Sequence, residues 1–94
     1  AVNTGDNNVA IGRKALFDNT SGNNTVAVGN DALTNQTTGA NNTAVGHTAD
    51  VGANNLVNAT AIGYGAVAGA SNSIQLGNSN VNLVKTSAIS LAFK

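Results

Sequence analysis

The chain of 94 residues contains no cysteine, proline, methionine or tryptophan, and it also lacks glutamate. Without cysteine, neither a disulfide nor a thiolate metal site can form. The four acidic residues are all aspartates and balance four basic residues, so the formal net charge is zero. This neutrality argues against nucleic acid and anionic membranes as partners, because both select a basic surface. No apolar run approaches the ~18 residues of a membrane span, so we expect no membrane contact from this segment.

Large side chains that could build a core are scarce. Aromatic residues make up 3% of the chain, and the 41% hydrophobic fraction consists largely of alanine and valine. Burying apolar surface contributes roughly 25 cal/mol per Å², whereas ordering costs about 1.5 kcal/mol per residue. A single globular chain of this composition would be only marginally stable. We therefore expect repetition, a partner subunit, or both to complete the core.

A branched apolar residue followed by glycine recurs five times. The first four of these glycines are spaced 17 residues apart, and the fifth follows after 14. The repeat glycines are Gly12, Gly29, Gly46, Gly63 and Gly77. An asparagine stands five residues before each of them, and this column is Asn7, Asn24, Asn41, Asn58 and Asn72. Regularity over so many columns favours a repetitive fold over disorder.

The column pattern is typical of short strands. In Val26-Ala27-Val28 the β-branched residues occupy alternate positions and share one face, while recurrent glycine and asparagine oppose a helix. We predict an all-β solenoid, a parallel β-roll of about five 14–17-residue coils, with one strand before each repeat glycine and one after it. If successive coils stack about 4.8 Å apart, the asparagines of the column lie above one another and form a ladder of amides. The β-roll is expected over residues 1–82, followed at 83–94 by a terminal coil or transition segment.

Alternation leaves open which apolar column lies inside the coil. We expect the branched residues to form the core of the chain, and these are Val9, Ile11, Val26, Val28, Val45 and Ile62. Either the alanine column or the column of Leu16, Leu33 and Val67 would then face outward. Identical apolar faces from sister chains, meeting on an axis, would supply the missing core.

Three stretches, Asn8–Gly12, Asn42–Gly46 and Ala59–Gly63, resemble the Hep/Hag repeat of the YadA-like head domains of trimeric autotransporter adhesins. The resemblance covers about residues 5 to 80. It implies a left-handed parallel β-roll that forms an obligate homotrimer. The passage Ser73–Ser79, running into Val84–Ser87, is also similar to the repeat stalks of bacterial and phage tail fibres.

No pattern in the chain supports catalysis, a cofactor or a bound metal. His47 is the sole histidine, and no cysteine or glutamate could join it in a metal site. The aspartates occur singly, and the serines lack both a base and a nucleophile elbow. Gly63–Ala68 matches a dinucleotide fingerprint, but no helical pattern follows it. We therefore predict a protein that is not an enzyme and needs no cofactor.

The position after each repeat glycine is polar and variable. This column, Arg13, Asn30, His47, Tyr64 and Asn78, is the candidate ligand-contact strip. Tyrosine and arginine are enriched where proteins bind partners, and a trimer would present the strip three times. The alternative is a solvated face of a passive spacer.

The resemblance implies a structural or adhesive segment of a trimeric extracellular fibre anchored at a bacterial outer membrane. Its partners would be host surfaces, matrix proteins or glycans. The alternative is a segment of a phage tail fibre or injection-system fibre, part of a virion, acting as a spacer or in receptor binding. An ice-binding solenoid would need rows of Thr-x-Thr, which Thr25, Thr43 and Thr60 do not form. Any export signal is expected to lie outside this segment or to have been removed.

Overall fold

The computed structural model describes residues 4–88, which are all-β and contain no helix. Two parallel sheets form the two walls of a solenoid, one of five strands in the order β1-β2-β3-β5-β7 and one of two strands, β4-β6. The strands are β1 (Val9–Ile11), β2 (Val26–Val28), β3 (Thr43–Val45), β4 (Asp50–Val51), β5 (Ala59–Ile62), β6 (Val67–Ala68) and β7 (Ser73–Leu76). The prediction of an all-β parallel solenoid is confirmed.

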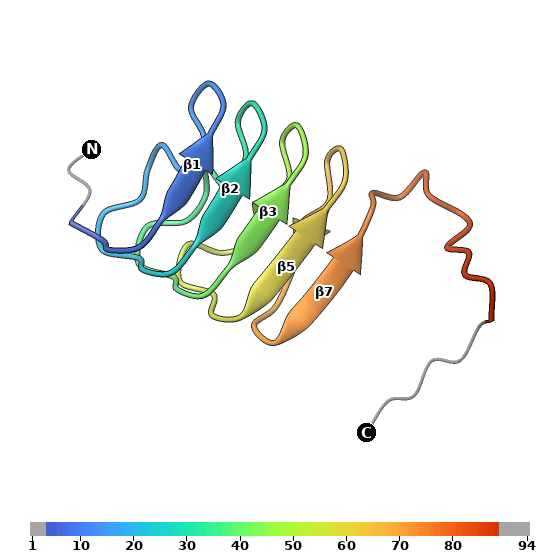
Figure 1. Ribbon diagram of the computed structural model, residues 1–94. Coiled ribbons are helices and arrows are strands. Elements are labelled where there is room, and N and C mark those ends of the chain that lie inside the picture. The colour runs from blue at the N-terminus through green and yellow to red at the C-terminus, as the bar shows by residue number, and fades with distance from the viewer. Residues whose placement is uncertain (1–3, 89–94) are drawn as a thin grey trace.

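Successive turns stack in register. Ala27 pairs with Ala44, and Ala44 pairs with Ala61, so each repeat lies directly over the previous one. Figure 1 shows the five strands of the larger sheet as successive rungs. Five rungs enclose about 4 turns. After β7 the chain leaves the stack, and residues 77–88 form no strand. The rest of the expected terminal segment lies outside the described residues.

The strand expected before each repeat glycine is present in all five rungs. The strand expected after the glycine forms only in the third and fourth repeats, as β4 and β6. The prediction is wrong for the fifth repeat, where residues 77–88 form no strand, and for the first two. There Leu16 and Leu33 lie in turns with φ of 57° and 56°. Their backbone N–H groups still bond the next turn, at the carbonyl oxygens of Ala32 and Ala49, at 2.9 and 2.7 Å. The left-handed conformation turns both leucines into the core, where they are buried.

The expected assignment of the core is also wrong, because the alternation is inverted. Alanines point inward: Ala27, Ala44 and Ala61 are 0% exposed. The branched residues expected inside lie on the outer side of the same strands and are exposed or half-buried. Leu16 and Leu33 are inside rather than outward, whereas Val67 is 48% exposed.

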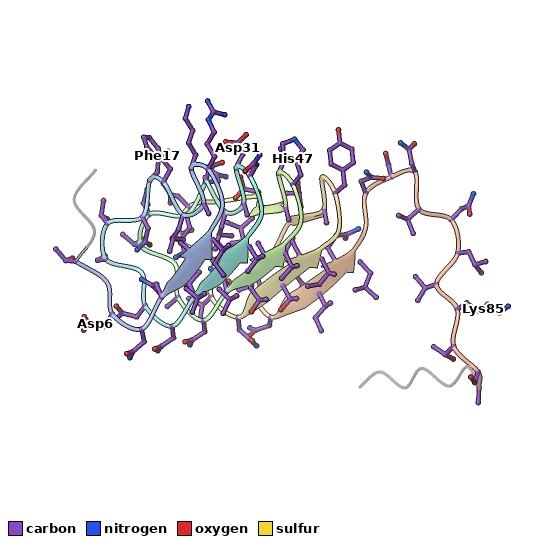
Figure 2. The ribbon with its side chains drawn as sticks, turned by 45° about the horizontal axis from the view of Figure 1, so that its top comes forward. Asp6, Phe17, Asp31, His47 and Lys85 are labelled. Carbon is purple, nitrogen blue, oxygen red and sulfur yellow. The ribbon has the colours of Figure 1, made fainter. Side chains whose placement is uncertain are left out.

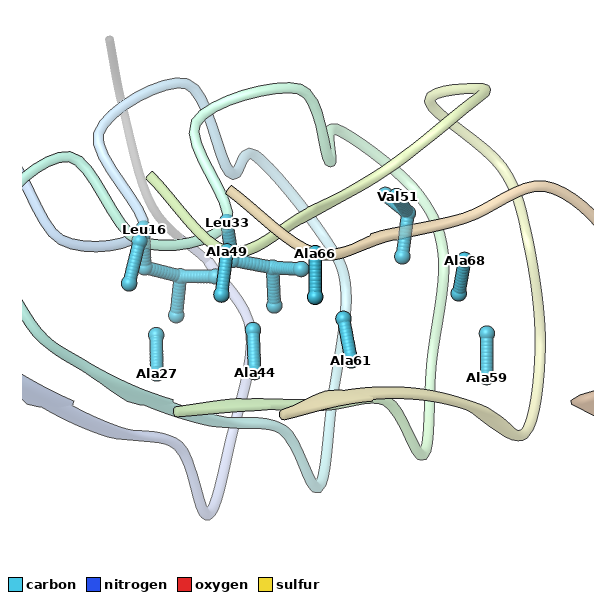
Figure 3. Packing of buried hydrophobic residues seen from close by; sticks show 11 residues of the cluster. Leu16, Ala27, Leu33, Ala44, Ala49, Val51, Ala59, Ala61, Ala66 and Ala68 are labelled. Carbon is cyan, nitrogen blue, oxygen red and sulfur yellow. The ribbon is translucent and has the colours of Figure 1, made fainter. Parts of the chain in front are cut away.

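The physical reason is the thinness of the coil. Figure 3 shows the alanine methyls of the larger sheet facing Leu16, Leu33, Ala49 and Ala66 on the opposite wall. Because leucines already fill the space from that wall, only a methyl group fits on the strand side. Of the eleven buried apolar residues in the described part, eight are alanines.

The repeat glycines are required by the backbone itself. Gly29 and Gly46 have φ of 133° and 135°, a region that L side chains rarely adopt. A Cβ added to Gly29 would lie 2.5 Å from the carbonyl oxygen of Gly46 on the next turn. Gly12, Gly29 and Gly46 therefore stand where the backbone of the next turn leaves no room for a side chain.

A buried polar network, which the sequence analysis did not foresee, completes the interior. Asn19, Thr25, Gln36 and Asn42 are at most 1% exposed. Asn42 Nδ2 donates to Gln36 Oε1 at 2.7 Å and to the carbonyl of Leu56 at 2.8 Å. Gln36 Nε2 in turn donates to Asn19 Oδ1 at 2.9 Å and to Thr25 Oγ1 at 3.2 Å. Within residues 4–88 every buried side-chain polar atom has a partner, which offsets the cost of its desolvation.

Candidate functional site

The candidate strip lies on the loops that follow the strands of the larger sheet. Arg13, Asn30, His47 and Tyr64 are exposed, and Asn78 is half-buried. Figure 2 shows Phe17, Asp31 and His47 along the same edge of the solenoid. The strip is thus a ridge along the stacking direction. No cleft or cavity occurs in the described range 4–88.

Hydrogen bonds between turns hold this ridge in register. The amide N–H of Arg13 donates to Asn30 Oδ1 at 3.1 Å, and His47 Nδ1 donates to the carbonyl of Asn30 at 3.1 Å. Further along, the amide N–H of Gly65 donates to the carbonyl of His47 at 3.0 Å. Asn78 Nδ2 donates to the carbonyl of Tyr64 at 2.9 Å. All five residues of the strip are therefore tied to a neighbouring turn.

Within the strip, His47 and Tyr64 form a parallel stack. Their ring centroids are 5.7 Å apart and their planes differ by 6°. Because the rings sit at equivalent positions of adjacent turns, this is an offset stack imposed by the backbone, the arrangement that aromatic pairs prefer. Tyr64 nevertheless remains 67% exposed.

A second aromatic contact lies on the first turn. Lys14 Nζ is 5.8 Å from the centroid of the Phe17 ring, which is 57% exposed. No matching aromatic column runs through the repeats, so the repeat pattern does not mark Phe17 as a candidate. Its only signal was an aromatic residue standing in a polar turn.

The asparagine column lies at the opposite ends of the strands from the strip and has a different role. All five asparagines adopt a left-handed conformation, with φ between 56° and 62°. Amide-to-amide bonds join Asn7 to Asn24 at 3.3 Å and Asn58 to Asn72 at 3.0 Å. At the two middle steps the contact between these turns runs through backbone groups instead: the N–H of Asn41 donates to the carbonyl of Asn23 at 3.0 Å.

The position that follows the column also bonds between turns, through side-chain oxygens that accept from backbone N–H groups. Asn42 Oδ1 accepts from the N–H of Ala59 at 2.8 Å. On an earlier turn, Asn8 Oδ1 accepts from the N–H of Thr25 at 2.9 Å. Each of these residues directly follows a column asparagine, so the recurrent Asn-Asn pairs were the available signal.

Neither a metal site nor a membrane-crossing helix emerges from the described residues. No group of three histidine, cysteine, aspartate or glutamate side chains comes together among residues 4–88. The Asp50 carboxylate instead accepts bonds from Thr34 Oγ1, the N–H of Asn35 and the N–H of Val51, at 3.1, 3.1 and 2.8 Å. The same range has no helix with the length and apolar character needed to cross a bilayer.

No protein-family model matches the sequence, and no curated protein or solved structure is significantly similar to the chain. The functional proposal therefore depends on the geometry of the chain itself. Two outward surfaces are relevant. One is the strip, and the other is the outer side of the larger sheet.

Proposed function

We propose that the chain is a non-enzymatic structural and adhesive segment of a homotrimeric extracellular fibre. The observation that carries the proposal is the inverted distribution of apolar residues: alanine inside, larger branched residues outside. The outer side of the larger sheet, called the outer face below, presents two parallel rows. These are Val9, Val26, Thr43, Thr60 and Ile74, and beside them Ile11, Val28, Val45, Ile62 and Leu76.

The energetics favour covering this face. A buried alanine methyl contributes far less than a buried isoleucine or leucine, because the gain scales with apolar area. Here Ile11, Ile74 and Leu76 are 60%, 71% and 49% exposed, while the interior is largely alanine. Soluble monomers rarely keep a large contiguous apolar patch exposed. Covering the outer face would supply the stabilisation that the thin core lacks.

Sister copies of the chain fit this face well. The two rows contain no charged residue, so identical faces can approach without repulsion. Each copy also presents its rows at the same spacing along the stack, so rungs can match rung for rung. Closed symmetry is the usual outcome for such self-complementary contacts. The number three and the left-handed coil come from the resemblance of the repeats to YadA-like heads.

Such an assembly would function through its shape and stiffness. Stacked, hydrogen-bonded turns around an apolar axis make a stiff rod, which projects whatever it carries. The strip stands on the loop edge of the solenoid and would appear three times, so that weak contacts to host surfaces, matrix proteins or glycans gain avidity. An extracellular location, on a bacterial surface fibre, fits the absence of cysteine.

The test is the mass of the folded chain in solution. Sedimentation equilibrium, checked by native mass spectrometry, is expected to give a trimer whose circular dichroism shows β structure. A stably folded monomer across the accessible concentration range would overturn the trimeric part of the proposal.

A phage tail fibre or injection-system fibre is the second candidate. Residues 77–88 favour it, because they leave the solenoid without forming a strand and include the later part of the passage similar to tail-fibre stalks. In that setting the solenoid would be a spacer or would bind a receptor. Sequencing the flanking gene region separates the two, since an outer-membrane anchor indicates an adhesin and a baseplate-attachment domain indicates a tail fibre.

A further inference from the structure

The stacked pair of His47 and Tyr64 is the most organised exposed feature of the strip. His47 covers one face of the Tyr64 ring, with centroids 5.7 Å apart. The equivalent residue on the following turn is Asn78, whose Nδ2 is held by the carbonyl of Tyr64 at 2.9 Å. Among the described residues no ring lies against the second face of Tyr64, which is 67% exposed.

Hydrogen bonds to neighbouring turns position the platform before any ligand arrives. His47 is fixed through the bond from Nδ1 to the carbonyl of Asn30 at 3.1 Å. Tyr64 stands between Gly63 and Gly65, whose φ values are 115° and 66°, and the N–H of Gly65 bonds the carbonyl of His47 at 3.0 Å. A preorganised ring loses little entropy on binding, which favours even a small ligand.

The polar groups around the ring point to a ligand rich in hydroxyl groups. Because His47 Nδ1 donates to a carbonyl, Nε2 of the neutral imidazole is an acceptor. The Tyr64 hydroxyl can both donate and accept. A flat apolar face bordered by such groups matches a pyranose, which has a face of C–H bonds and a rim of hydroxyls. The C–H hydrogens are slightly positive and are attracted to the negative face of the phenol ring.

The absence of charged residues around Tyr64 favours a neutral ligand over a cationic or an anionic one. No charged residue occurs between Asp50 and Lys85, so the turn carrying Tyr64 and the next turn are neutral. The carboxylate of Asp50 is occupied by three donors from its own surroundings. A cationic side chain would find no free carboxylate here, and an anionic sugar would find no lysine or arginine on these two turns. We propose that Tyr64, backed by His47, is a stacking site for neutral pyranose sugars.

Phe17 provides the contrast within the same molecule. Its ring is exposed as well, but the Lys14 ammonium lies 5.8 Å from its centroid and occupies a face. A sugar stacked on that face of Phe17 would have to displace the cation. The site at Tyr64 deepens the adhesive role proposed above, on which it depends only for the avidity of three copies.

The experiment is saturation-transfer-difference NMR on the full 94-residue chain. The probes are the methyl glycosides of galactose, glucose and mannose, with N-acetylneuraminic acid and N-acetyl-arginine amide as charged comparisons. We expect transfer to the ring C–H protons of at least one neutral glycoside, with a millimolar Kd. Transfer to the charged probes alone, or to no probe, overturns the proposal.

Variants locate the site. Tyr64→Asn installs the residue that the repeat itself uses at Asn30 and Asn78, so the coil should tolerate it. It is expected to weaken binding at least about tenfold. Tyr64→Phe keeps the ring and should stay within about threefold, and Phe17→Asn should bind like the parent chain. Equal binding by Tyr64→Asn and the parent chain overturns the assignment. Sedimentation of the same samples keeps the outcomes distinct, because a trimer that binds no sugar disproves only the sugar site.

Discussion

Gln36 and Asn19 face each other across one turn of the solenoid, with Gln36 Nε2 donating to Asn19 Oδ1 at 2.9 Å. Both side chains are at most 1% exposed. Asn42 extends the chain of amides, donating to Gln36 at 2.7 Å and accepting from the N–H of Ala59 at 2.8 Å. Buried polar groups of this kind strongly favour one arrangement, since a slip in register would leave them without partners.

Replacing the central amide should therefore cost stability. Gln36→Leu removes the bond to Asn19 Oδ1 and the acceptor of Asn42 Nδ2 from a buried setting, and we expect a loss of about 1–3 kcal/mol in the free energy of unfolding. Gln75→Leu is the matched control, because Gln75 is exposed and its Nε2 bonds only the nearby carbonyl of Gly77. Urea denaturation followed by circular dichroism, at one protein concentration, measures both. Equal effects of the two variants would contradict a stabilising network.

The sequence was sufficient for the strands before the repeat glycines but not for their orientation. Alternation shows which residues share a face, and Val26 and Val28 do share one, but it does not show which face is inside. The choice of the inner face depended on Leu33. Its left-handed φ of 56° turns the side chain inward, so that the leucine fills the coil from the opposite wall. Alanine and valine are both apolar, so hydrophobicity could not decide between them.

The candidate site was predictable only in part. The column placed His47 over Tyr64, and the structure adds their stacking geometry. The buried amides were not foreseeable, because Asn19 and Gln36 stand in polar turns, where side chains are normally solvated. Their burial results from the stacking of consecutive turns over one another. The sequence of a single repeat does not reveal this tertiary effect.

The close approach of adjacent turns makes a second prediction possible. Gly29→Ala places a methyl group 2.5 Å from the carbonyl oxygen of Gly46 and forces alanine to a φ of 133°. We expect a loss of about 2 kcal/mol or more, with a marked drop in the thermal midpoint. Gly69→Ala is the control, since a Cβ there meets nothing within 4 Å. If thermal melts of the two variants coincide, the turns are not packed as described.

Backbone strain at Thr48 offers a stabilising change. Thr48 is β-branched yet has φ of 59°, a conformation that costs free energy for such a side chain. Asparagine tolerates this region better, so Thr48→Asn should raise the free energy of unfolding by about 0.5–1 kcal/mol. Thr38→Asn serves as the comparison, because Thr38 is exposed and is not among the residues with positive φ. A decrease in stability for Thr48→Asn would show that the Thr48 hydroxyl bond to the carbonyl of His47, at 2.6 Å, outweighs the strain.

The proposed trimeric interface can be located with a single charge. Val45 lies on β3, the central strand of the larger sheet, and is 38% exposed in the lone chain. If sister copies cover the outer face, Val45→Lys buries an unpaired ammonium at the contact and should convert the trimer to monomers or unfold it. Val67→Lys adds the same charge to the opposite wall, at a residue 48% exposed, and should leave the trimer intact. Sedimentation velocity distinguishes the two outcomes. A trimer that survives Val45→Lys but dissociates with Val67→Lys would place the interface on the β4-β6 wall instead.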